Sequence, residues 1–460
     1  MTEFSDLIQP DKGQDAIAIH LVDKDGLEAF MKARTAQQRT ALEAQKFEAD
    51  GYATAIMPDG DSWAAVGGVA NTGELSSWCL AKLAEILPAG TYRRAGGEPG
   101  PAMFGWLTAQ YRFARYLDDG EVIGPRVLLT GEPGKIGAVV AQAEATALVR
   151  DLVNTPAEDM GPDALEAECE RVAKAQGAKM SVTRGDALET GYPMVHAVGR
   201  AATRKHAPRM IELTWGKEDA PRLAIVGKGV CFDSGGLDIK SSSGMLIMKK
   251  DMGGAAHALA LAQLVMGQNL PVRLHLLIPA VENAIAENAL RPGDVIASRA
   301  GKTVEITNTD AEGRLILGDA LTRAYEEEPE FLVDFATLTG AARSALGPDL
   351  PALFAKKDET AEAILKAGKR CDDACWALPL YSGYDEWLKS DIADFVNSHS
   401  NAFAGASVAA LFLARFVPAE ADWVHFDTYA WRPAPKPGRP KGGEALGLRA
   451  TWAMLQERFG

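Results

Sequence analysis

The sequence Asn308-Thr309-Asp310-Ala311-Glu312-Gly313-Arg314-Leu315 carries two carboxylates two residues apart and a guanidinium two residues further on. In extended backbone, residues i, i+2 and i+4 project to the same side, so Asp310, Glu312 and Arg314 would converge on one small volume. Clustered carboxylate oxygens are the ligands that hard divalent cations prefer. The alternative is an acidic turn before a helix that begins near Leu315, because Asp and Glu are favourable at a helix N-terminus.

A second motif runs from Gly227 to Gly254. It begins Gly-Lys-Gly-Val-Cys-Phe-Asp-Ser-Gly-Gly, passes Lys240 and ends Met-Lys-Lys-Asp-Met-Gly-Gly. A phosphate-binding loop is one alternative, but the run lacks both Gly-x-x-x-x-Gly-Lys-Ser/Thr and Gly-x-Gly-x-x-Gly. The other alternative makes Asp251 the N-cap of the following helix, which is compatible with a ligand role. The glycines permit positive φ and close approach of the backbone.

The two motifs together supply four carboxylates, from Asp233, Asp251, Asp310 and Glu312. Four carboxylates in one site would repel one another unless cations neutralised them, and two divalent ions would do so. Two ions roughly 3.5–4 Å apart can activate one bridging water while they polarise a carbonyl. Lys228 and Lys240 would bring amines to the same place, where nearby cations favour the neutral amine that can ligate a metal. Arg314 keeps its proton and would be a fixed positive anchor for an anion.

The chain has 460 residues, which is enough for two domains. Its composition, 47% hydrophobic and 24% charged, is typical of a soluble globular protein. The formal net charge of −14 argues against a general nucleic-acid binder and against adsorption to anionic membranes. No apolar run is long enough to span a bilayer, and residues 1–6 do not resemble the start of a secretory signal.

Five cysteines, an odd number at sparse spacing, favour reduced thiols and a cytoplasmic protein. Cys371 and Cys375 share a short segment, but neither a second pair nor a nearby histidine completes a zinc site. The seven histidines form no His-x-x-x-His pair. A metal site in this chain would therefore be built from carboxylates.

The predicted fold is α/β, with a small N-terminal domain at residues 1–135. Its expected strands are Asp15–Val22, Tyr52–Met57 and Trp63–Val69, and its expected helices are Leu27–Ala49, Leu75–Ile86 and Met103–Tyr116. The aromatic residues of the last helix are expected to pack in the core. An Ala-rich helix at 136–153 is expected to link this domain to the rest of the chain.

Residues 154–460 are predicted to form a larger C-terminal domain with a central, mostly parallel sheet flanked by helices. Apolar runs suited to buried strands alternate with helical segments, at Met210–Trp215, Leu223–Val226, Gly254–Val265, Val272–Val281, Leu315–Glu326 and Phe331–Phe335. In such sheets, sites lie at the carboxyl ends of strands. Both motifs follow predicted strands, so both are expected at that edge.

The motifs, taken together, resemble those of the leucyl aminopeptidase family, the M17 metallopeptidases (cytosol aminopeptidases). The resemblance is carried by residues 227–236, by Met-Lys-x-Asp-Met-Gly-Gly-Ala-Ala at 248–256 and by the stretch at 308–315. Asp334 to Ala341 is similar to a further family signature, and the match covers roughly residues 140–450. The resemblance implies a metal-dependent aminopeptidase that acts on peptides with a free N-terminus, with residues 154–460 as its catalytic domain.

The resemblance also implies roles for individual residues. A tightly bound ion would be held by Lys228, Asp233, Asp251 and Glu312, and a more exchangeable one by Asp233, Asp310 and Glu312. Lys240 would stabilise the gem-diolate, and Arg314 would bind a bicarbonate that acts as general base. The pocket for the N-terminal side chain would be lined by Met248, Thr337, Leu338 and Gly340. The family's usual ions are Zn²⁺, Mn²⁺ or Mg²⁺, and its usual assembly is a homohexamer.

The implied mechanism uses a metal-bridging water that attacks the scissile carbonyl, while Lys240 and the ions offset the charge that develops on the oxygen. One ion would bind the free α-amino group, which an internal peptide lacks. A two-metal phosphoesterase is an alternative that the lack of histidine ligands disfavours. A catalytically silent scaffold is a second alternative, but a structural cation site would need neither Lys240 nor Arg314.

The C-terminal part departs from the family pattern. His425 to Trp431 reads His-Phe-Asp-Thr-Tyr-Ala-Trp where His-x-Asp-Ile-Ala-Gly-Thr is usual, and Glu444 to Gly447 stands where Thr-Gly-x-Gly is common. Val408 takes the place of a threonine. Because these positions are expected near the pocket and the C-terminal closure, they put the side-chain preference in doubt rather than the metal chemistry.

Overall fold

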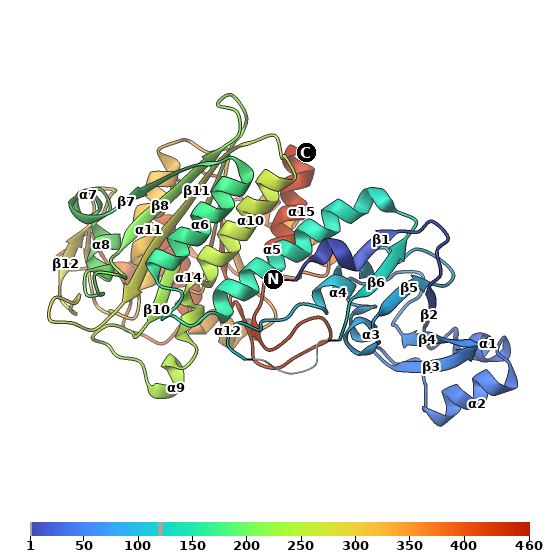
Figure 1. Cartoon of the computed structure of the whole chain (residues 1–460). Helices are drawn as coiled ribbons and strands as arrows, with labels where there is room; N and C mark the ends of the chain where they lie inside the picture. The colour runs from blue at the N-terminus through green and yellow to red at the C-terminus, as the bar shows by residue number, and fades with distance from the viewer. Residues whose placement is uncertain (1, 118–122) are drawn as a thin grey trace. The chain divides into compact units, whose positions relative to one another are not determined.

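A computed structural model of the chain describes residues 2–117 and 123–460 (Figure 1). It contains two compact units, of which the first comprises Met1–Ala147 with Ala434–Lys441 and the second Leu148–Pro433 with Gly442–Gly460. The division falls inside helix α5 (Ile136–Asn154), the segment expected to join the two halves. No sequence pattern indicated that the late segment Ala434–Lys441 belongs to the first unit.

The first unit is built on a six-stranded sheet with the strand order β1-β6-β5-β2-β4-β3. Neighbouring strands are parallel except β3 and β4, which form an antiparallel pair. The strands are β1 (Ile8–Pro10), β2 (Ile17–Val22), β3 (Thr54–Asp59), β4 (Ser62–Gly68), β5 (Gly90–Arg94) and β6 (Arg126–Thr130). The helices are α1 (Leu27–Lys32), α2 (Ala36–Ala44), α3 (Ala81–Ile86) and α4 (Ala102–Thr108), with 3₁₀ turns η1 (Phe4–Leu7) and η2 (Pro133–Lys135).

All three predicted helices of this unit differ from the structure. The helix expected to begin at Leu75 begins at Ala81, because residues 77–80 form a turn. The expected single helix Leu27–Ala49 is interrupted between α1 and α2, because Thr35 caps α2: its side chain accepts a hydrogen bond from the Gln38 N–H, and the Gln38 side chain accepts one from the Thr35 N–H. The helix expected to reach Tyr116 ends at Thr108. The prediction that its aromatic residues pack in the core is confirmed for Trp106 and Tyr111, which are buried, and is wrong for Tyr116, which is exposed.

The second unit contains a nine-stranded sheet with the order β16-β15-β18-β14-β9-β11-β8-β7, and β10 also pairs with β11. Its central strands β18, β14, β9 and β11 are parallel, while β15, β8 and β7 pair with antiparallel neighbours. The strands are β7 (Lys179–Thr183), β8 (Arg209–Trp215), β9 (Arg222–Gly227), β10 (Gly229–Asp233), β11 (Arg273–Asn283), β14 (Phe331–Ala336), β15 (Ala352–Ala355), β16 (Trp376–Ala377) and β18 (Trp423–Asp427). The mostly parallel sheet expected from the sequence is confirmed.

Helices cover both faces of this sheet (Figure 1). Helices α6 (Pro162–Gln176) and α10 (Gly253–Gly267) lie along one face, and α8 (Pro193–Gly199), α11 (Glu312–Tyr325) and α14 (Gly405–Ala414) pack on the other. The remaining helices and 3₁₀ turns are α7 (Gly185–Gly191), α9 (Ser242–Met245), η3 (Met248–Met252), α12 (Gly340–Leu346), α13 (Asp358–Arg370), η4 (Ser382–Leu388) and α15 (Leu448–Phe459). Small pairings complete the unit: β12 (Val295–Ala297), β13 (Thr303–Glu305) and β17 (Phe395–Val396) form one sheet, and β19 (Trp431–Arg432) pairs with β20 (Gly442–Gly443).

Glycines let the start of α10 approach the central strands closely. A Cβ added to Gly254 would lie 2.1 Å from the backbone oxygen of Phe335 in β14. A Cβ added to Gly227, the last residue of β9, would lie 2.6 Å from the Cα of Ala255. Since a larger side chain would force these elements apart, the glycines of the second motif fix the position of η3, which directly precedes α10.

Among residues 2–117 and 123–460, no helix has the length and hydropathy needed to cross a bilayer. The five cysteines all lie within these ranges and form no disulfide.

Candidate metal and catalytic site

The site lies at the carboxyl ends of the parallel strands, where the sheet rule places it. Lys228 directly follows β9, Asp233 ends β10 and Thr337 directly follows β14. The backbone N–H of Lys228 donates to the Phe335 carbonyl over 2.9 Å, which ties the end of β9 to β14. The main sheet therefore brings residues more than a hundred positions apart into one site.

The stretch 308–315 is not extended. The prediction that Asp310, Glu312 and Arg314 project to the same side of an extended backbone is therefore wrong. Asp310 lies in a turn, where its N–H donates to the Asn308 Oδ1 over 2.8 Å. Helix α11 begins at Glu312 rather than near Leu315, so Glu312 and Arg314 both lie in its first turn. The preceding strand, β13, belongs to the small three-stranded sheet and not to the main one. The turn, rather than a strand edge, presents these side chains to the site.

Carboxylates from both motifs nevertheless come together. Asp233, Asp310 and Glu312 each offer one carboxylate oxygen, and these oxygens all lie within 4.8 Å of one another. Within the described part of the chain, this is the single group of three or more acidic, histidine or cysteine side chains that close together. Asp233 and Glu312 are buried, whereas the side chain of Asp310 is 33% exposed.

Lys228 links a further carboxylate, that of Asp251, to this group. Its Nζ lies 2.6 Å from the Asp251 Oδ2 and 2.9 Å from the Glu312 Oε1, and all three side chains are buried. Burial alone would lower the pKa of Lys228, but the negative charges of Asp251, Glu312 and Asp233 raise it. Lys228 lies beside Asp251, as it must if the two side chains belong to one site.

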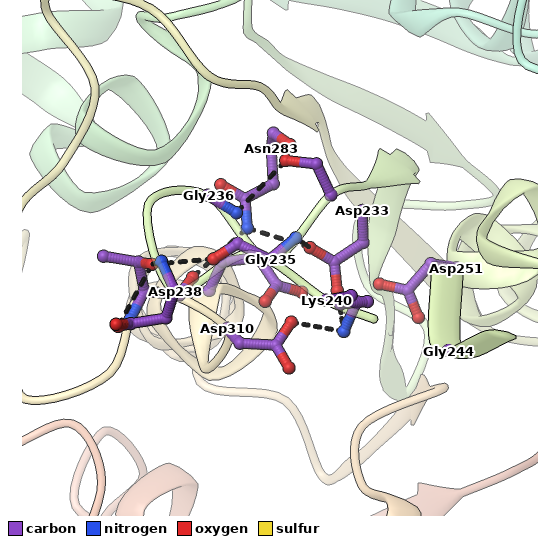
Figure 2. Close-up of polar contacts among 12 residues, drawn as sticks. Asp233, Gly235, Gly236, Asp238, Lys240, Gly244, Asp251, Asn283 and Asp310 are labelled. Carbon is purple, nitrogen blue, oxygen red and sulfur yellow. Dashed lines mark hydrogen bonds and ion pairs between the residues drawn. The ribbon is translucent and has the colours of Figure 1, made fainter. Parts of the chain in front are cut away.

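Lys240 bridges the two motifs on the other side of the site (Figure 2). Its Nζ lies 2.8 Å from the Asp233 Oδ2 and also contacts the Asp310 Oδ1. Partial burial opposes the charge on this amine, but Asp233 and Asp310 raise its pKa above the ordinary value. Lys240 thus supplies a positive charge at the mouth of the acidic cluster.

A hydrogen-bond network that the sequence analysis did not identify holds the loop 234–240 in place (Figure 2). The Asn283 side chain donates to the Asp233 Oδ1 over 2.9 Å and to the Thr309 carbonyl over 3.2 Å. The Thr309 hydroxyl donates to the Gly235 carbonyl, and Asp238 exchanges hydrogen bonds with Thr309. Asn283 ends the observed strand β11 and lies two residues after the predicted strand Val272–Val281, so the carboxyl-end rule could have singled it out.

Arg314 is buried, and its Nη1 donates to the Asn397 carbonyl over 2.7 Å. Burial lowers the pKa of this guanidinium to about 10, although the negative charge of Glu312 acts in the opposite direction. The group still carries its charge at neutral pH. Arg314 is therefore a buried cation beside the carboxylate cluster.

The donor set fits a divalent cation. Both oxygens of Glu312 and the Oδ2 of Asp251 are buried without a hydrogen-bond donor, apart from the Lys228 ion pairs. Burial, reinforced by Asp233, raises the pKa of Glu312 to about 8 and that of Asp310 to about 6. Excess negative charge and unsatisfied oxygens are what oxygen-ligated metal sites present before a cation neutralises them.

A cavity of about 850 Å³ opens onto this cluster. Every predicted catalytic, metal-binding or substrate-binding residue except Glu312 lines it, including Met248, Thr337, Leu338 and Gly340. Glu312 is 1% exposed and lies behind the cavity wall. The cavity is large enough for the end of a peptide.

Three further residues line the cavity: Lys250 was not predicted, whereas Asp427 and Tyr429 fall in the stretch 425–431 that was expected near the pocket. Asp427, at the end of β18, accepts hydrogen bonds from the Leu338 N–H, the Thr339 N–H and the Thr339 hydroxyl, and so fixes the segment after β14. Tyr429 also lines the cavity. Lys250 lines it from η3, and burial lowers the pKa of its amine to about 8.

Two positions at which the sequence departs from the family pattern, Val408 and Glu444, do not line the cavity. Val408 packs in the core of α14, and Glu444 pairs with Arg150 over 3.0 Å and with Arg432 over 3.2 Å. Neither is among the residues that line the cavity. These two positions are thus not part of the pocket lining, whereas the residues that follow β18 do form part of its wall, as expected.

Comparisons with known proteins agree with this geometry. The catalytic-domain model of the cytosol aminopeptidase family matches residues 147–451, and the N-terminal-domain model of the M17 aminopeptidases matches residues 17–127. A probable cytosol aminopeptidase of Syntrophotalea carbinolica is 40% identical over 77% of this chain and 74% of its own length. Another from Roseiflexus castenholzii is 34% identical over 91% of this chain and 88% of its own.

Solved structures are similar over nearly the whole length. The crystal structure of a cytosol aminopeptidase from Coxiella burnetii superposes with a TM-score of 0.93 at 43% identity, covering 99% of this chain and 100% of that one. The bottromycin maturation enzyme BotP in complex with Mn superposes with a TM-score of 0.87 at 31% identity, covering 97% of this chain and 100% of that one.

Proposed function

The chain belongs to the cytosol aminopeptidase family and is a metal-dependent aminopeptidase, and from that premise we propose how its residues remove the N-terminal amino acid of a peptide. The observation that carries the proposal is the cluster of carboxylates and lysines at the carboxyl ends of β9, β10 and β14.

We propose that the cluster holds two divalent ions, Zn²⁺, Mn²⁺ or Mg²⁺. Lys228, Asp233, Asp251 and Glu312 hold the tighter ion, and Asp233, Asp310 and Glu312 hold the more exchangeable one. The unsatisfied oxygens of Glu312 and Asp251 support this assignment, as does the Mn in the BotP complex. When bound, such ions supply an activated water nucleophile and polarise a carbonyl.

The side chains of the cavity wall do the remaining work. Lys240 stabilises the charge that develops on the substrate oxygen, because its amine is positively charged and lies at the cavity wall beside Asp233 and Asp310. Arg314 holds an anion, with bicarbonate as the proposed general base that takes up a proton. Met248, Thr337, Leu338 and Gly340 surround the first side chain of the substrate.

The reaction class is tested with two chromogenic substrates offered to the metal-loaded protein. We expect hydrolysis of aminoacyl-arylamides and no hydrolysis of aryl phosphates, because the cluster offers no histidine to a phosphoryl centre. N-acetylated aminoacyl-arylamides serve as the control and should resist cleavage, since acetylation removes the free amine. Cleavage of the phosphate alone would support the phosphoesterase alternative, and no hydrolysis of either at full metal occupancy would support the silent scaffold.

We also propose that the chain assembles as a homohexamer in the cytoplasm, with residues 1–135 as the N-terminal domain, 136–153 as the linker helix and 154–460 as the catalytic domain. The hexamer rests on the family resemblance, and the cytoplasmic location on the name of the relatives and on five cysteines without disulfides. Light scattering should give six times the mass of one chain, and the mass of a single chain would refute the hexamer.

A further inference from the structure

One buried lysine in the cavity wall has no function in the chemistry described above. Lys250 is 5% exposed and lines the cavity from η3, between the proposed pocket residue Met248 and the proposed ligand Asp251. A lysine is almost never buried this deeply unless its charge is paired. We therefore ask whether a ligand in the cavity supplies the negative charge that pairs with the Lys250 amine.

Within the described residues, the structure records no hydrogen bond from the Lys250 amine. The single carboxylate oxygen recorded near its Nζ is the Asp251 Oδ1, at 3.9 Å, which is beyond hydrogen-bond range. That carboxylate is already engaged: its Oδ1 accepts from the Thr337 hydroxyl over 2.7 Å, and its Oδ2 pairs with Lys228 over 2.6 Å. Divalent ions at the cluster would engage it further. Asp251 is thus not the counter-charge of Lys250.

A second cation lies against the same wall. The Lys250 Nζ is 5.2 Å from the centre of the Tyr429 ring, and the Arg343 guanidinium carbon is 4.9 Å from it. Arg343 lines the cavity, and one of its nitrogens would lie 3.8 Å from a Cβ added to Gly340. No ion pair of Arg343 is recorded in the described part of the chain. Two cations, neither of them hydrogen-bonded to a carboxylate in the described part of the chain, therefore share Tyr429.

The remaining acid of this wall is occupied. Asp427 accepts three hydrogen bonds from Leu338 and Thr339, the segment that leads to Gly340. Lys250 and Arg343 consequently place two positive charges on the wall that also contains Met248 and Gly340. An apolar side chain placed there would leave the Lys250 amine desolvated and unpaired, whereas a carboxylate would pair with it.

We propose that Lys250, assisted by Arg343, makes this enzyme favour peptides whose N-terminal residue carries a side-chain carboxylate, aspartate or glutamate. This inference rests on the proposed function, because it assumes that the first side chain of the substrate lies against Met248 and Gly340. It assigns Lys250 to specificity and not to the reaction itself.

The test compares glutamyl- with glutaminyl-arylamide on the metal-loaded full-length protein, since these substrates differ in charge but hardly in shape. We expect kcat/KM for the glutamyl substrate to be higher by about tenfold or more. In Lys250→Met, which keeps the length of the side chain without its charge, that ratio should fall to about one. Leucyl-arylamide turnover should be kept or raised. Lys250→Arg should retain a preference for glutamyl substrate.

Lys249→Met is the matched control, because the Lys249 amine donates to the Asn154 carbonyl over 2.5 Å and so has its partner. Any change in rate should be the same for both substrates, so the glutamyl-to-glutaminyl ratio should stay as in the wild type. Free glutamate should also inhibit the wild type more strongly than free glutamine, a comparison that needs no variant to fold. Leucyl-arylamide turnover with a wild-type ratio near one, or an unchanged ratio in Lys250→Met, would overturn the inference. Failure of every aminoacyl-arylamide would instead overturn the proposed function.

Discussion

Replacing Glu312 with glutamine should lower kcat/KM for an aminoacyl-arylamide by about a thousandfold or more, which corresponds to about 4 kcal/mol of lost transition-state stabilisation. Glu312 is, with Asp233, one of the two residues proposed to hold both ions, and apart from its ion pair with Lys228 its buried oxygens have no hydrogen-bond donor in the structure. An amide of the same size fills the same space but removes the negative charge from the cluster. The measurement is steady-state kinetics at saturating metal.

The control for this variant is its fold. Lys228 keeps Asp251 as a partner at 2.6 Å when Glu312 is neutralised, so the circular dichroism spectrum of the variant should match that of the wild type. Glu327→Gln removes a surface carboxylate that pairs with Arg323, further along the same chain segment, and should leave turnover unchanged. A folded Glu312→Gln protein with wild-type turnover would remove this residue from the mechanism.

Lys240→Met should lower kcat by about a hundredfold to a thousandfold and change KM much less. The amine lies 2.8 Å from the Asp233 Oδ2, beside the acidic cluster where we propose that charge develops on the substrate oxygen. Methionine preserves the length of the side chain but cannot stabilise that charge. Rates measured over a range of substrate concentration separate kcat from KM.

Metal content decides between a catalytic and a merely structural Lys240. If Lys240 only held Asp233 and Asp310 in place, its loss would disturb the proposed metal ligands and lower the metal content of the protein. The account instead predicts a variant with normal metal content and low kcat. Lys240→Arg, which keeps a positive charge, should recover part of the rate. A Lys240→Met protein with wild-type kcat would contradict the role proposed here.

The sequence was sufficient to find the residues that gather at the site, because they belong to short local motifs. Lys228 and Asp233 follow or end apolar runs that form buried strands, so the carboxyl-end rule placed them correctly. The acidic residues could be grouped by charge alone, since four carboxylates without cations would not share a site. The mostly parallel sheet followed from strands that alternate with helices.

Local geometry was predicted less well, because long-range contacts determine it. The extended interpretation of residues 308–315 failed since the Asn308 side chain closes a turn and α11 begins at Glu312. The network that joins Asn283 to Asp233 spans 50 positions and leaves no local pattern in the sequence. The unpaired state of Lys250 depends on Thr337, 86 positions from Asp251, which occupies the nearest carboxylate oxygen. Such facts depend on tertiary contacts.

The most direct test of the two-ion site counts metal ions. The purified protein is stripped with a chelator and titrated with Mn²⁺, while bound metal and aminoacyl-arylamide turnover are followed together. We predict two equivalents bound per chain, no turnover in the stripped protein, and turnover that rises with the weaker equivalent. Full turnover in the metal-free protein, or maximal turnover with no Mn²⁺ bound, would contradict the two-ion site.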